Sequence, residues 1–344
     1  MAERTLTQRE LNRALLARQL LLERARTPIP RALERIAGIQ AQYAPSMYVG
    51  LWSRLEDFER PQLTRALERR SVVQATLMRT TIHLVSKRDY WPFAIGIRRE
   101  LRAHWIKAHK ADRRRLEAAA RKLRPRLAKG PVRQAEIDQL LSADAVTRNG
   151  VGVFLHLVRV PPSGTWDRRR ADVYALAEDW IGSEKVAEGE GVEVLVRRYL
   201  QGFGPASPQD IADWAGLKVT TIRPGLESLE LRRFQDEEGK ELLDLPRAPL
   251  PDPDTPAPAR FLPVWDATLL VHARRTGILP EEHRSRVFNV RTPHSVNTFL
   301  VDGQVAGTWR YEKGRVRLEP FGRLAREARA ELNEEAERLA SFHA

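Results

Sequence analysis

The 344-residue sequence contains no cysteine, so disulfide bonds and metal sites built on thiolates are excluded. No apolar run approaches the roughly 20 residues that a membrane-spanning helix needs. The N-terminal residues Met1-Ala2-Glu3-Arg4 are not followed by the apolar segment of a secretory signal. We therefore expect a cytoplasmic protein with no membrane partner.

The common signatures of metal and cofactor chemistry are also absent. The sequence has no Gly-rich phosphate-binding loop, and no two histidines are spaced four residues apart, as ligands on one helix would be. We expect neither a metal ion nor a cofactor. Any chemistry must come from ordinary polar side chains.

Positive charge is plentiful. The formal net charge is +13, and arginine far outnumbers lysine. The planar guanidinium group suits phosphate because it donates two parallel hydrogen bonds. A GC-rich, arginine-favouring genome would produce the same excess, so charge alone leaves nucleic-acid binding open.

Two glutamines, Gln40 and Gln42, lie two residues apart in the segment 38–43, after an apolar helical run. The downstream segment 78–85 is typical of a strand. A glutamine amide cannot act as a strong base, but its donor and acceptor can hold a water molecule or a base edge. We expect the two segments to face each other across a small DNA-facing site that positions a water. A helix end capped by side-chain amides is the alternative.

The first 95 residues have the element order of a winged helix. A capping-box pattern at 7–10 begins a helix over 5–24, and further helices are expected over 31–40 and from Pro61 to about Arg70. Strands are expected over 72–78 and 81–85. In a winged helix, the third helix enters a DNA groove and the hairpin forms the wing.

Alternation along the second strand places Thr81 and His83 on one face, together with Arg79. Ile82 and Leu84 lie on the other. We expect the polar, basic face to contact DNA, although the solvent face of any two-sided hairpin has the same pattern.

Residues 97–129 form a basic helical region that contains Arg98 and Arg102 and has few acids. Such a run either is a solvated helix face or follows a phosphate backbone.

An internal repeat relates residues 130–137 to residues 204–211. Glycine, proline, an acid and isoleucine coincide at the same offsets. In the second copy, Ser207 is suited to cap a helix that begins at Pro208 and ends at Gly216, and a further helix follows. The first copy leads into an expected strand over 153–158 and a wing turn at 161–166. With the N-terminal region, the repeat indicates three related units.

The C-terminal part has a different composition. Seven prolines over 246–263 indicate an extended connector. Strands are expected over 267–272, 298–301, 304–309 and 311–318, with an Asp302-Gly303 hairpin turn and a last helix over 324–339. The fold class is therefore α+β and mainly helical, with three tandem winged helix-turn-helix units and a β-rich C-terminal region. The expected segments are 1–95, 96–190, 191–245 and 246–344.

Together, several motifs make the chain resemble the AlkZ/YcaQ family of winged-helix bacterial DNA glycosylases. The resemblance covers nearly the whole chain. The motifs are GIQAQ at 38–42, LWSRL at 51–55, RTTIHLV at 79–85, RVPPSGTW at 159–166, RYL at 198–200, FGPAS at 203–207, RFLP at 260–263 and LVDG at 300–303.

The resemblance implies a concave, basic surface that binds double-stranded DNA, and hydrolytic excision of alkylated purines, including crosslinked N7-alkylguanines, in DNA repair. It assigns catalysis to Gln40 and Gln42, the two-glutamine form of the motif. It also implies a nucleoid-associated location. The residues expected to contact the lesion or the DNA are Tyr43, Ser46, Arg54, Arg79, Thr81, His83, Arg98, Arg102, Arg168, Arg169 and Arg198.

The chemistry of the lesion agrees with a pair of glutamines. An N7-alkylated guanine already carries a positive charge and leaves without protonation, so the enzyme needs a held water more than a strong base. No lysine nucleophile is required, and we expect a monofunctional enzyme. A crosslinked base cannot easily be flipped, which favours a shallow site. The absence of long apolar heptads favours a monomer.

Two other interpretations use the same residues. A non-catalytic winged-helix protein, such as a regulator or chromatin-associated factor, would bind DNA with a steep salt dependence and release no base. A scaffold for protein partners would bind DNA weakly at physiological salt. Outside Gln40 and Gln42, nothing in the sequence separates the enzyme from the non-catalytic DNA-binding protein.

Overall fold

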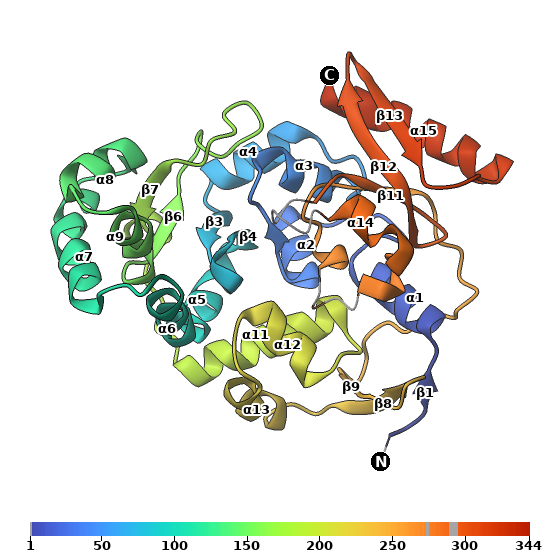
Figure 1. The fold of residues 1–344 in the computed structure, drawn as a ribbon, viewed down its shortest axis with the longest axis horizontal. Coiled ribbons are helices and arrows are strands. Elements are labelled where there is room, and N and C mark those ends of the chain that lie inside the picture. The colour runs from blue at the N-terminus through green and yellow to red at the C-terminus, as the bar shows by residue number, and fades with distance from the viewer. Residues whose placement is uncertain (1, 271, 273–274, 289–294) are drawn as a thin grey trace.

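The computed structural model describes residues 2–270, 272, 275–288 and 295–344, which form a mixed α/β molecule (Figure 1). The described strands make three sheets, with strand orders β1-β8-β9, β10-β11-β12-β13 and β2-β4-β3-β6-β7-β5. The mixed composition agrees with the predicted α+β class. No helix in the described ranges is both long and apolar enough to cross a membrane.

The N-terminal helices begin within three residues of the predicted starts and end earlier than predicted. The predicted capping box is formed by Thr7 and Glu10, and the first helix stops before Leu20, which has a left-handed φ of 58°. The second helix does not reach Gln40, because Ala37 and Gly38 have φ values of 62° and 80°. A strand follows instead. The elements are α1 (Gln8–Arg18), α2 (Ile29–Ile36), β2 (Ile39–Gln40), α3 (Ala44–Trp52) and α4 (Arg60–Glu68).

Helix α3 was not predicted, and its burial explains why. Every residue from Ala44 to Trp52 is buried. A helix that is buried on all sides has no alternation of polar and apolar faces for a sequence pattern to detect. The third predicted helix, α4, is confirmed.

The predicted hairpin exists, but it is not a free wing. It consists of β3 (Val72–Thr76) and β4 (Ile82–Ser86), joined through the 3-10 turn η1 (Met78–Thr80). Strand β4 also pairs with β2, and β3 pairs with β6 (Leu157–Arg159). Strands β7 (Val173–Leu176) and β5 (Val132–Arg133) complete the sheet. Both hairpin strands therefore lie inside the sheet rather than at a solvent edge.

The basic region is two helices, because Lys110 has a left-handed φ of 49° and the Asp112 side chain caps a new helix. The predicted strand over 153–158 is shorter and begins at Leu157, after a 3-10 turn. The elements are α5 (Lys87–Gly96), α6 (Arg98–His109), α7 (Arg113–Leu127), α8 (Gln134–Leu141), α9 (Ala145–Gly150), η2 (Val151–Val153) and α10 (Ala177–Ile181).

The second copy of the repeat folds as predicted. Ser207 caps the helix that starts at Pro208, and Gly216 ends it with a φ of 70°. Strand β1 (Thr5–Leu6) pairs in parallel with β8. The remaining elements are α11 (Glu188–Phe203), α12 (Pro208–Ala215), α13 (Val219–Glu227), β8 (Arg232–Asp236) and β9 (Glu241–Asp244).

In the C-terminal part, the predicted Asp302-Gly303 hairpin turn is confirmed, with φ values of 48° and 77°. The predicted strand over 267–272 is wrong for its first half. There, Asp266 caps a 3-10 turn by accepting from the Thr268 N–H. Val271 lies outside the described residues. The elements are β10 (Arg260–Leu262), η3 (Ala267–Leu269), η5 (Arg275–Gly277), η6 (Glu281–His283), α14 (Arg284–Val287), β11 (Thr298–Val301), β12 (Gln304–Glu312), β13 (Arg315–Pro320) and α15 (Arg326–His343).

One apolar core runs through all four predicted segments. It includes Leu16, Val73, Val158, Leu195 and Leu300, each at most 1% exposed. Helix α11 packs against α1, α2, α5, α12 and α13, and in Figure 1 it lies below the central sheet. The burial of these side chains holds β2, η1 and α12 together, and the candidate site lies where they meet.

Candidate functional site

The two glutamines lie at the edge of the central sheet. Gln40 is the last residue of β2, is 8% exposed and is the strand partner of His83 in β4. Gln42 follows and is exposed. The structure thus confirms that the segment around Gln40 faces the strand 82–86, although it approaches as a strand and not as a helix end.

Both glutamine side chains are held through their amide oxygens. Gln42 Oε1 accepts a hydrogen bond from the Ile82 backbone N–H at 3.2 Å. Gln40 Oε1 accepts one from Arg79 Nη2 at 3.3 Å. A carbonyl oxygen has two lone pairs, so each amide oxygen keeps one further acceptor position. Each amide oxygen is thus held in place by a protein donor, as the orientation of a water molecule requires.

Arg79 joins this strand to helix α12. Its Nη1 donates to the Trp214 carbonyl oxygen, while Nη2 donates to Gln40. The close approach requires a glycine in α12's C-cap, since a Cβ on Gly216 would lie 3.1 Å from the Arg79 backbone nitrogen. Burial lowers the pKa of Arg79 to about 10, so the side chain remains cationic at neutral pH. Arg79 is thus part-buried and tied to the protein, and not on an open solvent face.

The turn that carries Arg79 is strained. Arg79 and Thr80 are consecutive non-glycine residues with φ values of 54° and 60°. A β-branched residue rarely adopts this left-handed conformation. Strain of this kind persists where the surrounding structure enforces it, often at functional sites. Here Thr81 contributes by donating its hydroxyl to the Met78 carbonyl oxygen at 3.1 Å.

Two buried histidines lie close to Arg79. His83 is 3% exposed, and its Nδ1 lies 3.0 Å from the Thr81 carbonyl oxygen. Burial, with the nearby Arg79 charge, lowers the pKa of His83 to about 3. The predicted DNA contact by His83 is therefore not supported by its position, because the second strand is covered on this side. At neutral pH, His83 is uncharged.

His272 was not predicted as a site residue. It is 3% exposed, and neither ring nitrogen has a hydrogen-bond partner in the described ranges of the chain. Burial lowers the pKa of His272 well below the usual histidine value, and Arg79 and His83 lower it further. Nothing local in the sequence indicates that His272 lies at the site, because it is 189 positions away from His83, its neighbour in the fold.

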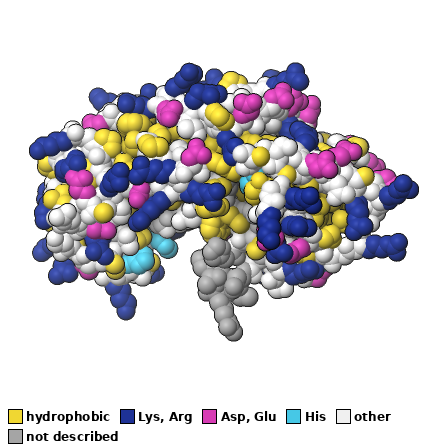
Figure 2. Space-filling view, turned by 90° about the horizontal axis from the view of Figure 1, so that it is seen from above, with side chains coloured by type: hydrophobic (Ala, Val, Ile, Leu, Met, Phe, Trp, Pro, Cys, Tyr) yellow, Lys and Arg dark blue, Asp and Glu magenta, His cyan; other side chains and the backbone are white. Residues whose placement is uncertain are grey.

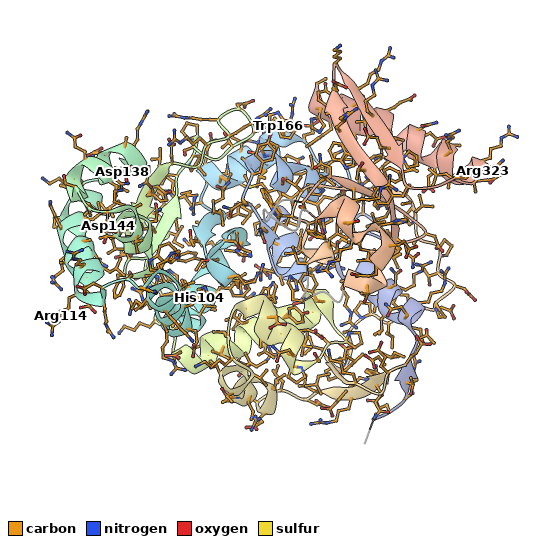
Figure 3. All side chains as sticks on the ribbon, viewed as in Figure 1. His104, Arg114, Asp138, Asp144, Trp166 and Arg323 are labelled. Atoms are coloured by element: carbon orange, nitrogen blue, oxygen red, sulfur yellow. The ribbon has the colours of Figure 1, made fainter. Side chains whose placement is uncertain are left out.

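An exposed tyrosine–arginine pair lies next to Gln42. Tyr43 is 41% exposed, and its hydroxyl accepts from Arg169 Nη1 at 3.0 Å. Arg168 beside it is also exposed. The loop that carries Arg168 and Arg169 is anchored by Trp166 (Figure 3). The centroid of the Trp166 ring lies 5.6 Å from that of the Tyr48 ring. Three of the predicted DNA contacts therefore have side chains open to a ligand beside the glutamines: Tyr43, Arg168 and Arg169.

Three other predicted contacts have a structural role instead. Arg54 is 2% exposed and pairs with Asp266 at 2.9 Å. Arg198 is bound by both carboxylate oxygens of Asp89, at 2.8 and 2.9 Å. Ser46 is 3% exposed. The two arginines are neutralised and the serine is covered, so their positions do not support the prediction that they contact DNA.

Arg98 and Arg102 are half-buried and fasten α6 to the segment after α9. Arg98 donates to the Phe154 carbonyl oxygen at 3.0 Å and to His156 Nε2. Arg102 donates to the Val153 carbonyl oxygen at 2.9 Å. Neither side chain lies free along a solvated helix face, as the predicted contact with a phosphate backbone would require.

Lys and Arg side chains are spread over both lobes of the face shown in Figure 2, among apolar and uncharged surface. Over the part of the chain that the structure describes, no group of three or more His, Asp or Glu side chains is placed to hold a metal ion.

Comparison with known proteins identifies one family and one related structure. The family model "DNA glycosylase AlkZ-like" matches residues 33–342. The solved structure of the Streptomyces sahachiroi DNA glycosylase AlkZ superposes with a TM-score of 0.82 at 18% sequence identity, and the match covers 98% of this chain and 97% of that one. At this identity the superposition establishes a shared fold. A comparison with curated protein sequences found no match.

Proposed function

The chain belongs to the AlkZ-like family of DNA glycosylases, and from this we propose that it is a monofunctional enzyme that excises alkylated purines, N7-alkylguanine above all, from double-stranded DNA. The observation that carries the proposal is the glutamine pair. Both amides are fixed, one by Arg79 and one by the Ile82 N–H, beside the exposed Tyr43 and Arg169.

In the proposed reaction, Gln40 and Gln42 hold the attacking water through their remaining acceptor positions. The alkylated base leaves with the electron pair of the glycosidic bond, and positive charge develops on the sugar. Orientation of the water supplies much of the rate, since a positioned reactant removes most of the entropic barrier. The water adds to the sugar carbon and its proton passes to solvent.

The neighbouring histidines suit a cationic transition state. The low pKa values of His83 and His272 keep both rings neutral at physiological pH. A protonated imidazole at either position would repel the developing charge on the sugar. Burial of the two rings therefore adds no positive charge to that of Arg79, which already contacts Gln40.

We also propose that the chain contains three winged helices in tandem, over 1–95, 96–190 and 191–245. The order helix, strand, helix, helix, hairpin occurs twice, as α2-β2-α3-α4-β3-β4 and as α7-β5-α8-α9-β6-β7. It is nearly repeated by α11-α12-α13-β8-β9, where Ala206 bridges to Leu243 in the position of the missing strand. The first strand of each unit pairs with the last, which supports a common architecture.

The proposed substrate surface surrounds the exposed Gln42, Tyr43 and Arg169. We propose that this site is shallow and accepts bulky or crosslinked N7-alkylguanines without full extrusion of the base. We propose that the protein acts as a monomer in DNA repair and associates with the nucleoid. A complex with the lesion base enclosed in a deep cavity would contradict the shallow site.

The test is release of free base from a duplex that carries one N7-methylguanine. Gln40→Ala and Gln42→Ala should each lower the single-turnover excision rate on the order of 100-fold, the effect of losing alignment of a reactant. DNA affinity should remain nearly unchanged. Gln139→Ala, which alters an exposed glutamine of α8, is the matched control.

The possible results separate the enzyme from a non-catalytic DNA-binding protein. Release that requires both glutamines supports the proposal. Affinity that falls in parallel with rate would make Gln42 a binding residue. Tight duplex binding without release, on both methylated and crosslinked DNA, would favour a regulator or a chromatin-associated factor.

A further inference from the structure

A cavity of about 210 Å³ lies between α5 and α6 on one side and the segment from α9 to β7 on the other. It does not include the catalytic glutamines. Its polar lining comes mainly from Tyr90, Arg98, Arg148, His156, Arg159 and Tyr174. This cavity is therefore separate from the proposed glycosylase site, and what it binds is a separate question.

The cavity carries cationic side chains and no acidic ones. Among its described lining residues are three arginines but no aspartate or glutamate. Arg159 is 9% exposed, and its two terminal nitrogens share the Thr76 hydroxyl at 3.2 Å each. Its Nε has no partner within the described ranges. The buried guanidinium group also lies over the Tyr174 ring, 5.3 Å from its centroid. Its hydrogen bonds are thus incomplete, and its partners among the described residues are neutral side chains.

Arg98 is in a similar position. It donates to a carbonyl oxygen and to His156 Nε2, both neutral acceptors. His156 cannot be a source of negative charge, and burial together with Arg98 lowers its pKa to about 3. Arg98 therefore lines the cavity with hydrogen bonds to neutral acceptors only, among the described residues.

Two carboxylates lie near the cavity. Glu178 acts electrostatically on Arg98, its Oε1 pairs with Arg124 at 2.6 Å, and its buried Oε2 has no hydrogen-bond partner among the described residues. Asp138 lies 3.8 Å from Arg148 at the half-exposed end of the cavity. Within the part of the chain that the structure describes, no carboxylate forms a salt bridge with Arg98 or Arg159. Buried charges in proteins are normally paired, so Arg159 lacks the expected counterion.

We propose that the cavity binds a phosphomonoester, held by Arg98 and Arg159. The planar guanidinium groups can each donate paired hydrogen bonds to phosphate oxygens, and Arg159 Nε is available for one of them. The cavity has space for a small group attached to the phosphate, beside the rings of Tyr90 and Tyr174. The same chemistry occurs in a free sugar phosphate or nucleotide and at the 5′-phosphate of a DNA strand end.

The first experiment is a titration of the full chain with inorganic phosphate at constant ionic strength, followed by calorimetry and by thermal unfolding. The expected result is saturable binding at one site and a rise in Tm that follows occupancy. Arg159→Met should weaken binding at least about tenfold, as loss of a charge-assisted bidentate contact does. Arg114→Met, at the outer edge of the α7–α9 lobe (Figure 3), should leave it unchanged.

A second pair of measurements identifies the source of the phosphate. A duplex with a 5′-phosphate end is compared with the same duplex ending in a hydroxyl. A preference for the phosphorylated end that Arg159→Met abolishes assigns the site to DNA ends. Binding of deoxyribose 5-phosphate without such a preference assigns it to a free metabolite.

The proposal is overturned if the wild-type protein shows neither saturable phosphate binding nor a preference for the phosphorylated end. It is also overturned if Arg159→Met binds phosphate as the wild type does. Should that variant fail to fold, crystals of the wild type soaked in tungstate decide the matter. A tungstate ion between Arg98 and Arg159 supports the site, and tungstate bound only elsewhere excludes it. Base excision is not the readout, so this inference and the proposed function can fail independently.

Discussion

At the scale of single residues, the geometry of Arg79 has the most consequences. One guanidinium group holds both the Gln40 amide and the Trp214 carbonyl oxygen, from two elements that are distant in sequence. The sequence predicts Arg79 as a DNA contact, whereas the structure gives it two protein acceptors. We infer that Arg79 acts through Gln40, as a positioning residue.

Replacement of Arg79 by lysine tests this role. A lysine has one nitrogen and cannot hold both acceptors in the fixed geometry of the guanidinium fork. We expect Arg79→Lys to lower the single-turnover excision rate on the order of tenfold, the cost of about one hydrogen bond to a charged group. DNA affinity, measured separately by anisotropy, should change little.

A different pattern of results would show that Arg79 contacts a DNA phosphate. A phosphate contact depends mainly on charge, which lysine retains, so excision and affinity would both remain near wild type in Arg79→Lys. They would fall together in Arg79→Gln. Arg114→Lys offers a matched control, because Arg114 is exposed at the outer edge of the α7–α9 lobe (Figure 3).

At the scale of elements, the candidate site depends on how closely the C-terminal end of α12 approaches η1. Gly216 closes the helix in the left-handed region and leaves room for the Arg79 backbone. The same glycine thus serves the local helix stop that the sequence predicts and a long-range contact that it does not. A side chain at this position would push the two elements apart.

We expect Gly216→Ala to lower the free energy of unfolding by about 2 kcal/mol, from left-handed strain and displacement of the turn. Excision should also fall, because Arg79 moves away from Gln40. Urea unfolding and single-turnover kinetics measure the two effects. Gly239→Ala is the matched control, since Gly239 has a similar φ of 79° but open space around its Cβ position. It should lose only about 1 kcal/mol and no activity.

If the two alanine variants lose the same stability and both retain full excision, the contact between α12 and η1 does not position Arg79. Both variants place alanine at a positive φ and so share the backbone strain. The difference between their losses of unfolding free energy therefore measures the effect of the close approach alone.

At the scale of the whole molecule, buried neutral histidines make stability dependent on pH. Burial in the shared core, beside Arg79 and His272, lowers the pKa of His83 to about 3. An unfolded histidine has a pKa of about 6.5. Below that pH, the unfolded chain binds a proton that the folded chain excludes. The contribution of neutral His83 to the free energy of unfolding is therefore fully present above pH 6.5 and is lost as the pH falls towards 3.

We expect the linkage to His83 alone to lower the free energy of unfolding by about 2 kcal/mol when the pH falls from 8 to 5. Urea unfolding at both values should show a smaller loss in His83→Asn than in the wild type. His104→Asn, on the exposed face of α6 (Figure 3), should retain the wild-type difference. An unchanged pH dependence in His83→Asn would mean that the folded protein accepts the proton.

The sequence by itself determined the features that depend on neighbouring residues. Helix starts at Thr7 and Ser207, the stop at Gly216 and the turn at Asp302 all follow from side chains within a few positions of each other. The spacing of the two glutamines and the family motifs are likewise properties of the linear chain. These features predicted several of the helices, the hairpins and the family.

Only the tertiary structure decided which polar side chains face a ligand. Arg54 is neutralised by Asp266, more than 200 positions away, and His83 is covered although its strand alternates as a solvent face would. The predicted wing hairpin, β3–β4, lies inside a six-stranded sheet because β2 and β6 pair with its two strands. Burial is the reason, because it depends on which distant elements pack together, and a sequence pattern reports only the faces of one element at a time.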